Sequence, residues 1–303
     1  MTEKKKVLTG KRIGVFGKGG SGKSTTVVML ARALRNRGYE VCVLDADSTN
    51  IGLHRALGIE QAPVPLLDYF GGMVFSGGLV TCPVDDPTPL PGAEISLDQL
   101  GVKHYSHNDD GILFLTAGKI GDQGPGAGCD GPVAKIARDL RVSQDGKHPV
   151  TLVDFKAGFE DSARGAVTSL DWAIVVVDPT MAAIQMAVNM RDMVDQIKAG
   201  KLPATQHLET AELIEWANRI FREAAVKDVL VVLNRVRDEE MEGYVWKKLA
   251  EKGLEPIGVI HENTSIARSW LRGTPLGATN AQEDVERVVE KLEVVAERSS
   301  VSV

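Results

Sequence analysis

Residues 17–25 constrain the fold of this chain more than any other stretch of its sequence. They read Gly-Lys-Gly-Gly-Ser-Gly-Lys-Ser-Thr, follow a short apolar run at 12–16 and precede a segment with helical spacing at 25–37. A glycine-rich loop between a strand and a helix turns successive backbone N–H groups toward a phosphate, and the helix adds its positive N-terminal end. The sequence therefore predicts a strand, a phosphate-binding loop and a helix in that order.

The pattern Gly-x-x-x-x-Gly-Lys-Ser assigns chemistry to single positions of this loop. Lys23 would place its charge on the β- and γ-phosphate oxygens, and Ser24 would offer its hydroxyl to Mg²⁺. A glycine-rich turn without a ligand is the alternative, but it needs the strand, the helix and the hydroxyl to fall in register by chance. The residues predicted to contact the nucleotide here are Gly17, Lys18, Gly19, Gly20, Ser21, Gly22, Lys23, Ser24 and Thr25.

The rest of the chain alternates between two patterns. Short runs rich in β-branched residues, at 41–44, 112–115, 150–153, 173–177, 229–233 and 257–260, indicate strands buried on both faces. Segments with helical spacing lie at 132–140, 162–170, 181–197, 211–225, 239–251, 265–271 and 281–298. This alternation predicts an α/β fold with a doubly wound, mostly parallel sheet flanked by helices.

We expect one domain over residues 11–303, preceded by a tail at 1–10. The basic residues at 4–6 and 11–12 are interpreted as part of a solvated N-terminal run. Residues 61–110 are irregular and rich in proline, and loops of this length usually serve a function. We interpret this segment as an elaboration on the nucleotide face or on a partner interface.

Charge and composition exclude several classes of protein. A net charge of -6 argues against a surface for nucleic acid, which needs clustered Lys and Arg. No apolar run approaches the ~18 residues of a membrane span, and the start of the chain lacks the apolar stretch of a signal peptide. Three scattered cysteines do not make a disulfide framework. We therefore expect a cytoplasmic protein without a membrane association.

Acidic residues follow two predicted strands, at the edge where a parallel sheet binds its ligands. Asp47 comes just after the second strand and is predicted to orient or deprotonate the attacking water. Asp154 follows a later strand and is predicted to hold Mg²⁺ together with Ser24 and Asp47. Both carboxylates could instead cap helices. Gly158 could present its N–H group to the γ-phosphate as part of a switch loop.

A second lysine, Lys18, directly follows Gly17, although one lysine suffices to hold a triphosphate. The pattern Lys-Gly-Gly-x-Gly-Lys-Ser resembles the deviant phosphate loop of the MinD, ParA and nitrogenase iron protein group. In that group the extra lysine reaches the nucleotide of the opposite subunit, so the resemblance implies a homodimer in the ATP state. A second cation near the transferred phosphate would stabilise transition-state charge. Lys18, Lys23 and Asp47 are the predicted catalytic residues, with a solvated loop lysine as the alternative for Lys18.

The base is assigned from the ends of the last two strands. Asn234-Arg235 resembles the Asn-Lys/Arg pair that this group places beside the base, and His261 follows the last strand, where it could pack on the nucleotide. The guanine-selective Asn-Lys-x-Asp pattern is absent, because Arg237 occupies its last position. We therefore predict ATP, with Mg²⁺, as the cofactor.

A narrower resemblance covers most of the chain. The motifs that carry it lie at 44–47, 50–53, 66–68, 118–120, 126–129, 154–160, 164–165 and 177–179. They are similar to the accessory ATPases that insert nickel into carbon monoxide dehydrogenase. This resemblance implies a dimeric ATPase that assists the maturation of a client metalloenzyme.

Cys129 is where the chain departs from that family. The family carries Cys-x-Cys where this chain has Cys129-Asp130-Gly131, and it commonly has Glu and His at the positions of Lys156 and Asp161. Paired Cys129 residues, with Asp130, could bind Ni²⁺ or Zn²⁺ across a dimer axis. Cys129 could equally be a small buried residue.

The other cysteines offered no support for a metal site. Cys129 also resembles the first cluster cysteine of the nitrogenase iron protein, but 159–165 contains no second cysteine. One thiolate per subunit is too few for a shared four-iron cluster. Cys42 was expected in the core, and nothing near Cys82 in the sequence completes a metal site.

The leading hypothesis is an ATP-dependent dimeric switch that acts on a metalloenzyme. A positioning protein like MinD or ParA and an electron-donating ATPase like the nitrogenase iron protein are the alternatives. A MinD-like membrane anchor would be a basic amphipathic terminal helix, whereas 281–298 holds more acid than base. The sequence does not identify the client.

Overall fold

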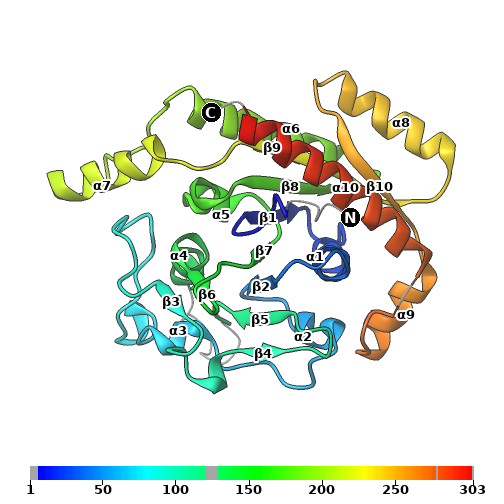
Figure 1. Cartoon of the computed structure of the whole chain (residues 1–303). Coiled ribbons are helices and arrows are strands. Elements are labelled where there is room, and N and C mark those ends of the chain that lie inside the picture. Colours follow the sequence, from blue (N-terminus) through cyan, green and yellow to red (C-terminus); the bar gives the residue numbers. More distant parts are fainter. Residues whose placement is uncertain (1–5, 120–128, 278, 302–303) are drawn as a thin grey trace.

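The computed structural model describes residues 6–119, 129–277 and 279–301. Its centre is an eight-stranded sheet in the order β10-β9-β8-β1-β7-β2-β5-β4 (Figure 1). All neighbouring strands are parallel except the edge pair β4 and β5. The strands are β1 (Arg12–Gly17), β2 (Val41–Ala46), β4 (Ser106–His107), β5 (Leu113–Thr116), β7 (Val150–Phe155), β8 (Trp172–Val177), β9 (Asp228–Val236) and β10 (Pro256–His261). The predicted doubly wound sheet and its seven predicted strands are confirmed; β4 was not predicted, nor was a separate two-stranded sheet elsewhere in the chain.

Most predicted helices are confirmed as well. The helices are α1 (Lys23–Asn36), α2 (Leu53–Leu57), α3 (Leu66–Tyr69), α4 (Gly131–Asp139), α5 (Glu160–Ala163), α6 (Met181–Lys198), α7 (Ala211–Arg222), α8 (Glu239–Ala250), α9 (Thr264–Arg272) and α10 (Asn280–Val301). The helix predicted over 162–170 is wrong. Gly165 adopts a left-handed conformation with φ 86° and separates α5 from the 3₁₀ turn η3 (Ala166–Ser169).

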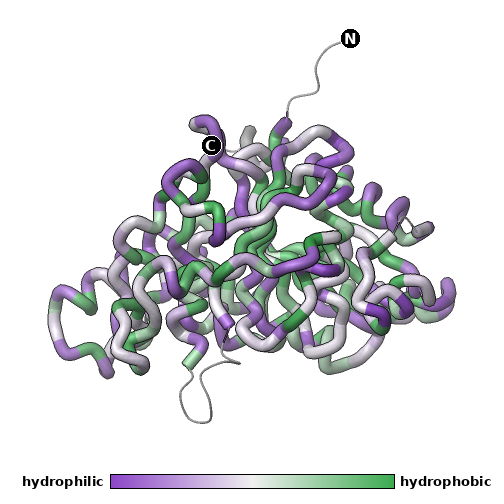
Figure 2. The backbone as a smooth tube through the Cα atoms, turned by 90° about the horizontal axis from the view of Figure 1, so that it is seen from below, coloured by the Kyte–Doolittle hydropathy of each residue, from purple (hydrophilic) through white to green (hydrophobic). Residues whose placement is uncertain are grey.

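Helices cover both faces of the sheet and make two hydrophobic cores. Apolar residues of α1, α2 and α10 pack on one face, and those of α3, α4, α6 and α8 pack on the other. Figure 2 shows hydrophobic segments gathered in the middle of the molecule. The strands are buried on both sides, which explains their nearly continuous apolar sequences.

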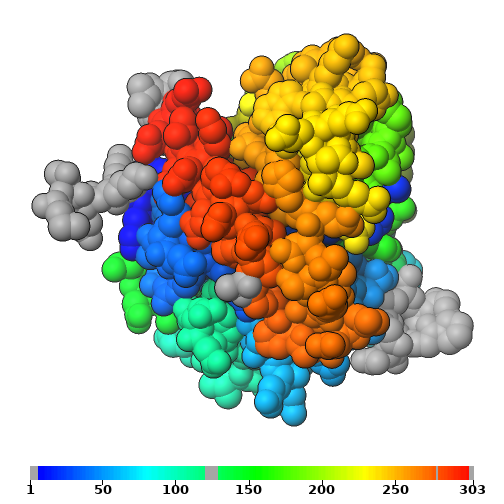
Figure 3. Space-filling model, turned by 90° about the vertical axis from the view of Figure 1, so that its right-hand side faces the viewer, coloured from blue at the N-terminus to red at the C-terminus, as the bar shows by residue number. Residues whose placement is uncertain are grey.

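The C-terminal helix α10 belongs to the core of the domain. Val285, Val288, Val289 and Leu292 are fully buried against α1 and β10, and Figure 3 shows α10 lying beside α1 on the surface. The apolar face of this helix is therefore covered by the protein itself. Among the described residues, no helix is long and apolar enough to cross a membrane.

The segment at 61–110 is a packed layer rather than a loose loop. It contains α3, β3 (Glu94–Ser96), β4 and the 3₁₀ turns η1 (Val74–Ser76) and η2 (Val102–His104). Strand β3 pairs in parallel with β6 (Arg141–Ser143), and Met73 and Val80 are fully buried. The Leu67 N–H donates to the Ala117 carbonyl (2.9 Å), which joins this layer to the end of β5. The layer thus supports the strand that leads to Gly118 and Lys119.

Arg12 corrects our interpretation of the basic N-terminal run. Its side chain is buried, and its guanidinium donates to the carbonyls of Leu140 (2.5 Å) and Ala137 (2.7 Å) at the end of α4. The last carbonyls of a helix lack partners within the helix, so a buried arginine can satisfy them. Leu8 is also fully buried. This part of the chain is anchored in the fold.

We expect Arg12→Met to lower the free energy of unfolding by about 2–4 kcal/mol, because it leaves buried carbonyls without donors. Urea unfolding followed by circular dichroism measures this change. Arg222→Met is the matched control, since Arg222 is exposed and pairs with Glu215 on the surface of α7. Equal losses in the two variants would contradict the anchoring role of Arg12.

Candidate nucleotide-binding site

The start of α1 has no side-chain cap, unlike the starts of α6, α7, α8 and α9. The helices α6, α7, α8 and α9 begin with side-chain caps from Thr180, Thr210, Asp238 and Asn263. Helix α1 begins at Gly22, in a left-handed conformation and without a side-chain cap. Its first N–H groups therefore remain available for an anion, and the helix dipole favours a negative charge there. A phosphate fits this position.

Two residues from the end of β9 hold the loop in shape. The Asn234 amide donates to the Ser21 carbonyl (2.7 Å), and the Arg235 guanidinium donates to the Gly20 carbonyl (2.8 Å). A Cβ atom on Gly22 would lie only 2.1 Å from Nδ2 of Asn234, so only glycine allows this approach. Asn234 and Arg235 thus lie against the phosphate loop. Their contact with the base stays a prediction.

The two lysines of the loop lie in different environments. Lys23 is 7% exposed, and its positive charge acts on the buried carboxylate of Asp154. Lys18 is exposed, and within the described parts of the chain its side chain makes no hydrogen bond or ion pair. One lysine is therefore placed inside the site, whereas the other extends toward solvent from the same loop.

A buried polar group between β7 and α1 fits a magnesium ion. The Ser24 hydroxyl donates to Oδ2 of Asp154 (2.6 Å) and accepts a hydrogen bond from the Asn50 amide (2.8 Å). Asp154 is fully buried, and its Oδ1 has no hydrogen-bond partner among the described residues. Such an orphaned carboxylate oxygen suits a hard cation and its bound waters. The structure thus brings Ser24 and Asp154 into contact, while their binding of Mg²⁺ stays a prediction; Asn50 was missed.

Asp47 lies in the loop after β2, beside this group. Its Oδ1 accepts hydrogen bonds from the N–H groups of Thr49 (3.0 Å) and Asn50 (3.1 Å) and from the Thr49 hydroxyl (2.7 Å). Here it stabilises its own loop and does not cap a helix, since the N-cap of the following α2 is Gly52. Its action on a water stays a prediction.

Lys119 is a charged neighbour that reasoning about the site missed. Its ammonium donates to Oδ2 of Asp45 (2.7 Å) and to the carbonyl of Asp47 (2.6 Å). Burial raises the pKa of Asp45 to about 6, even though Lys119 opposes the shift. The contact joins two strand ends that are 72 residues apart in sequence, so only the sheet order could reveal it.

The pKa of Asp154 is raised from 3.8 to about 7, first by burial and then by the negative charge of Asp45. Between these pH values the folded chain binds a proton that the unfolded chain has released. Without magnesium and nucleotide, we expect the free energy of unfolding to fall by on the order of 2–4 kcal/mol as the pH rises from about 4 to 7.

Urea unfolding in EDTA at a series of pH values measures this slope. Asp154→Asn should remove the largest single contribution and leave the smaller ones of Asp45 and Asp161, whose pKa values are raised by burial to about 6. Asp109→Asn, at an exposed position, should leave the slope unchanged. A pH profile for Asp154→Asn as steep as that of the parent chain would disprove the assignment.

Gly158 and His261 complete the list of predicted nucleotide contacts. The Gly158 N–H donates to the Gly17 carbonyl (3.3 Å). Residues 156–165, which we call the switch segment after the role predicted for Gly158, therefore contact the phosphate loop directly. The backbone N–H and Nδ1 of His261 both lie 2.9 Å from Oδ2 of Asp284 on α10. His261 is therefore held by an acid at the end of β10. Contact of Gly158 or His261 with a nucleotide stays a prediction.

Cys129 has a neighbour that the sequence did not reveal. The Gly131 N–H donates to Sγ of Cys129 (3.4 Å), and a Cβ on Gly131 would lie 2.5 Å from Sγ of Cys82. Both thiols therefore lie against Gly131, a proximity that the sequence did not predict, although no further ligand completes a metal site beside Cys82 among the described residues. The preceding glycine motif at 126–128 lies outside the described residues.

Asp130 does not fit the metal site that we considered for it. Its carboxylate receives ion pairs from Lys156 (2.6 Å) and Arg164 (3.2 Å). Burial alone would raise its pKa, but these two cations outweigh burial and lower the pKa. Within the described residues, no group of three or more His, Cys, Asp or Glu side chains could hold a metal ion. A complete nickel or zinc site is thus not formed within this part of one chain.

Strand β1, the uncapped glycine loop and α1, at the carboxyl edge of a doubly wound sheet, define a P-loop nucleotide-binding protein. The CobQ/CobB/MinD/ParA nucleotide binding domain family matches residues 15–276. The chain belongs to this family, as the deviant loop with Lys18 predicted.

Individual relatives agree with this assignment. An ATP-binding protein of Methanocaldococcus jannaschii is 29% identical over 283 residues, 92% of this chain and 100% of the relative. The carbon monoxide dehydrogenase accessory protein CooC of Rhodospirillum rubrum is 29% identical over 196 residues, 60% of this chain and 68% of CooC. The structure of Pyrococcus horikoshii MinD complexed with Mg-ADP is similar with a TM-score of 0.56, covering 94% of this chain and 97% of MinD. At 17% identity, this last likeness shows the fold alone.

Proposed function

We propose that the chain is an ATPase whose two copies close around ATP and reopen after hydrolysis. The observation that carries this proposal is the exposed Lys18, free of partners among the described residues, on the same loop as the buried Lys23. A cation that extends from the phosphate loop toward solvent is available to a nucleotide bound by a second copy. The other predicted groups lie around the same loop.

Each residue has one task in this proposal. The N–H groups of residues 19–25 and the Lys23 ammonium bind the β- and γ-phosphates of ATP, while Lys18 reaches the phosphates held by the other copy. Ser24 and Asp154 hold Mg²⁺, which when bound would neutralise charge on the phosphates. Asp47 orients the attacking water, which displaces ADP from the γ-phosphorus in line. Gly158 loses its bond to Gly17 and donates to the γ-phosphate instead.

The more specific function that we propose is assistance in the maturation of a metalloenzyme. The nucleotide-driven motion would be the step that acts on the client. CooC is named an accessory protein of carbon monoxide dehydrogenase, and the motifs shared with its family lie on the switch segment and before Cys129. Lys156 and Arg164 join that switch segment to Asp130, next to Cys129. Movement of Gly158 would therefore reach the thiols of Cys129 and Cys82.

The test is the mass of the chain in solution. With ATP and Mg²⁺, sedimentation velocity should show a dimer for Asp47→Asn, which binds ATP without hydrolysing it, and a monomer without nucleotide. A monomer at saturating ATP would refute the closing of two copies.

The proposed role in metalloenzyme maturation is tested by metal content. We expect the dimer to retain Ni²⁺ or Zn²⁺ after gel filtration, and Cys129→Ser to lose it. Equal metal content in the parent chain and in Cys129→Ser would refute the proposed metal binding by Cys129.

A further inference from the structure

A cavity of about 390 Å³ lies behind the switch segment, away from the phosphate loop. Its walls come from five parts of the chain: 83–87, Arg138 on α4, 162–165, the end of α6, and 201–221. The volume lies within the range of pockets that bind small organic molecules. Nothing in the proposed ATPase mechanism uses this space.

The wall of the cavity is mainly apolar. Helix α7 contributes Ile220 and Phe221, which are only half-buried, and Ala217 is the one residue of that helix that is buried. The apolar face of α7 is thus incompletely packed by the chain itself. An apolar ligand body would bury this surface, and burial of apolar area favours binding by about 25 cal/mol per Å².

The charged residues that line the cavity are Arg138, Arg164 and Lys201, with no Asp or Glu among the described lining residues. Arg138 and Arg164 already pair with Asp139 and Asp130 behind the wall. Lys201 donates only to the Gln196 amide (2.7 Å) among the described residues and has no acidic partner there. An anionic head on the ligand would neutralise the positive charge of Lys201.

Ser162, on α5, provides an independent indication of a polar ligand group. It lines the cavity and is 1% exposed, and its hydroxyl has no hydrogen-bond partner among the described residues. A buried hydroxyl without a partner costs free energy, so native proteins seldom leave one unsatisfied. An acceptor oxygen on a bound molecule would satisfy it.

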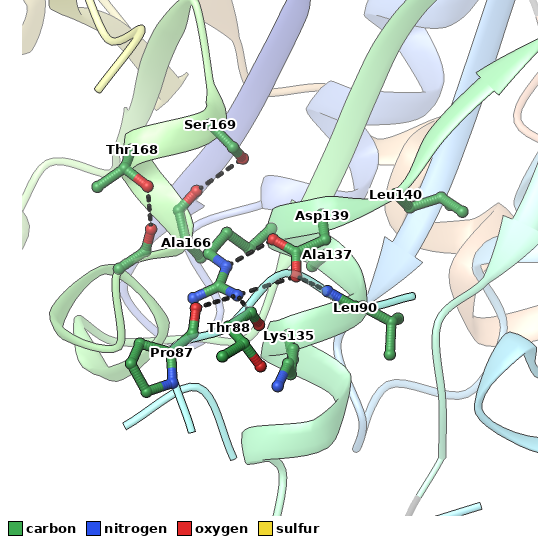
Figure 4. Close-up of polar contacts among 12 residues, drawn as sticks. Pro87, Thr88, Leu90, Lys135, Ala137, Asp139, Leu140, Ala166, Thr168 and Ser169 are labelled. Carbon is green, nitrogen blue, oxygen red and sulfur yellow. Dashed lines mark hydrogen bonds and ion pairs between the residues drawn. The ribbon is translucent and has the colours of Figure 1, made fainter. Parts of the chain in front are cut away.

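The cavity wall is held in shape before any ligand binds. The carbonyls of Pro87 and Thr88 accept hydrogen bonds from Arg138 (both 3.1 Å), whose guanidinium also contacts Asp139 (Figure 4). His207 Nε2 lies 2.8 Å from the Val84 carbonyl, which ties the two loops together. A preformed wall reduces the ordering cost of binding.

We propose that this cavity binds a small amphiphilic acid, a molecule with a hydrocarbon body and one carboxylate head. The body packs on Ile220 and Phe221 of α7. The carboxylate accepts a hydrogen bond from the Ser162 hydroxyl and pairs with the Lys201 ammonium at the rim. This site is separate from the nucleotide site, and its existence does not depend on the proposed ATPase function.

A second part of the inference rests on the proposed function. Ser162 and Arg164 follow Gly158 in the same switch segment, and Arg164 pairs with Asp130 (3.2 Å). The affinity of a ligand in contact with these residues would therefore change when the switch segment moves. By linkage, the acid and ATP must then change each other's affinity by the same factor.

Binding is tested on the full chain with octanoate as the probe, by isothermal titration, with 1-octanol as its uncharged counterpart. We expect one saturable site that prefers octanoate, and Ala204→Trp, which fills the cavity from an exposed position, should weaken it at least about tenfold. Ala225→Trp, exposed beside a neighbouring hollow, is the matched control and should leave affinity unchanged. Failure to saturate, or equal affinity in both tryptophan variants, overturns the site.

The head group is tested by two further variants. Lys201→Met should weaken octanoate about three- to tenfold and leave 1-octanol within twofold, whereas Ser162→Ala should weaken both probes, because the alcohol oxygen also accepts a hydrogen bond. Equal effects of Lys201→Met on the two probes would overturn the acidic head. ATP affinity with and without octanoate tests the coupling, and no difference overturns that part alone. A chain that binds octanoate but never hydrolyses ATP would refute the proposed function and leave the cavity site standing.

Discussion

Lys23→Ala is expected to abolish ATP binding, with a loss of affinity of at least about 100-fold, because charge-assisted hydrogen bonds to phosphate are the strongest contacts that this loop can make. Lys23 is buried at the start of α1, and no described side chain caps that helix. Without the ammonium, the phosphates would lose the buried positive charge that this loop places in its own site. Titration with a fluorescent ATP analogue measures the affinity.

Lys103→Ala is the matched control for this experiment, since Lys103 is exposed on η2, outside the described nucleotide site. It removes the same charge from the chain and should leave ATP affinity within about twofold. Circular dichroism of both variants verifies that the fold persists. If Lys23→Ala bound ATP as tightly as Lys103→Ala, residues 17–25 would not be the phosphate site.

Lys18→Ala is expected to keep ATP affinity within a few-fold while lowering kcat about 10³-fold, the size of effect that a cation supplied from a partner subunit has in phosphoryl transfer. The side chain is exposed and does not take part in the described contacts of its own loop. Its loss should therefore act on the transition state rather than on the bound ATP. Phosphate release measured beside ATP affinity separates the two effects.

Mixing two inactive variants tests whether Lys18 acts across the dimer. Lys18→Ala retains Asp47, and Asp47→Asn retains Lys18, so a mixed dimer contains one complete site if the lysine crosses. An equal mixture should recover about a quarter of the parent activity, because half of the dimers are mixed and each has one working site. No recovery, although dimers form, would show that Lys18 serves its own subunit.

Local sequence patterns were sufficient for the framework of the fold. Continuous apolar runs predicted the seven parallel strands, since a strand covered on both faces needs apolar residues at every position. The phosphate loop was also predictable from the sequence, because its function depends on consecutive backbone N–H groups and on glycines at fixed places. Asp154 could be placed near Ser24 because parallel strands end at the same edge of the sheet.

Contacts between distant segments could not be predicted in this way. Sequence spacing does not reveal which surfaces pack together, so Arg12 was assigned to solvent although it satisfies carbonyls of α4. Lys119 approaches Asp45 only because β5 lies beside β2 in the sheet. The helix expected over 162–170 failed because Gly165 adopts a left-handed conformation, which composition allows but does not require.

The sequence by itself thus determined the family, the phosphate loop and the parallel sheet, since these follow from residues that are adjacent or repeat along the chain. Only the tertiary structure decided which groups share a space. It placed Cys82 beside the segment of Cys129, paired Asp130 with Lys156, and formed a cavity against Ser162. Such contacts depend on how separate elements pack, and packing is determined by the fit of whole surfaces rather than by local pattern.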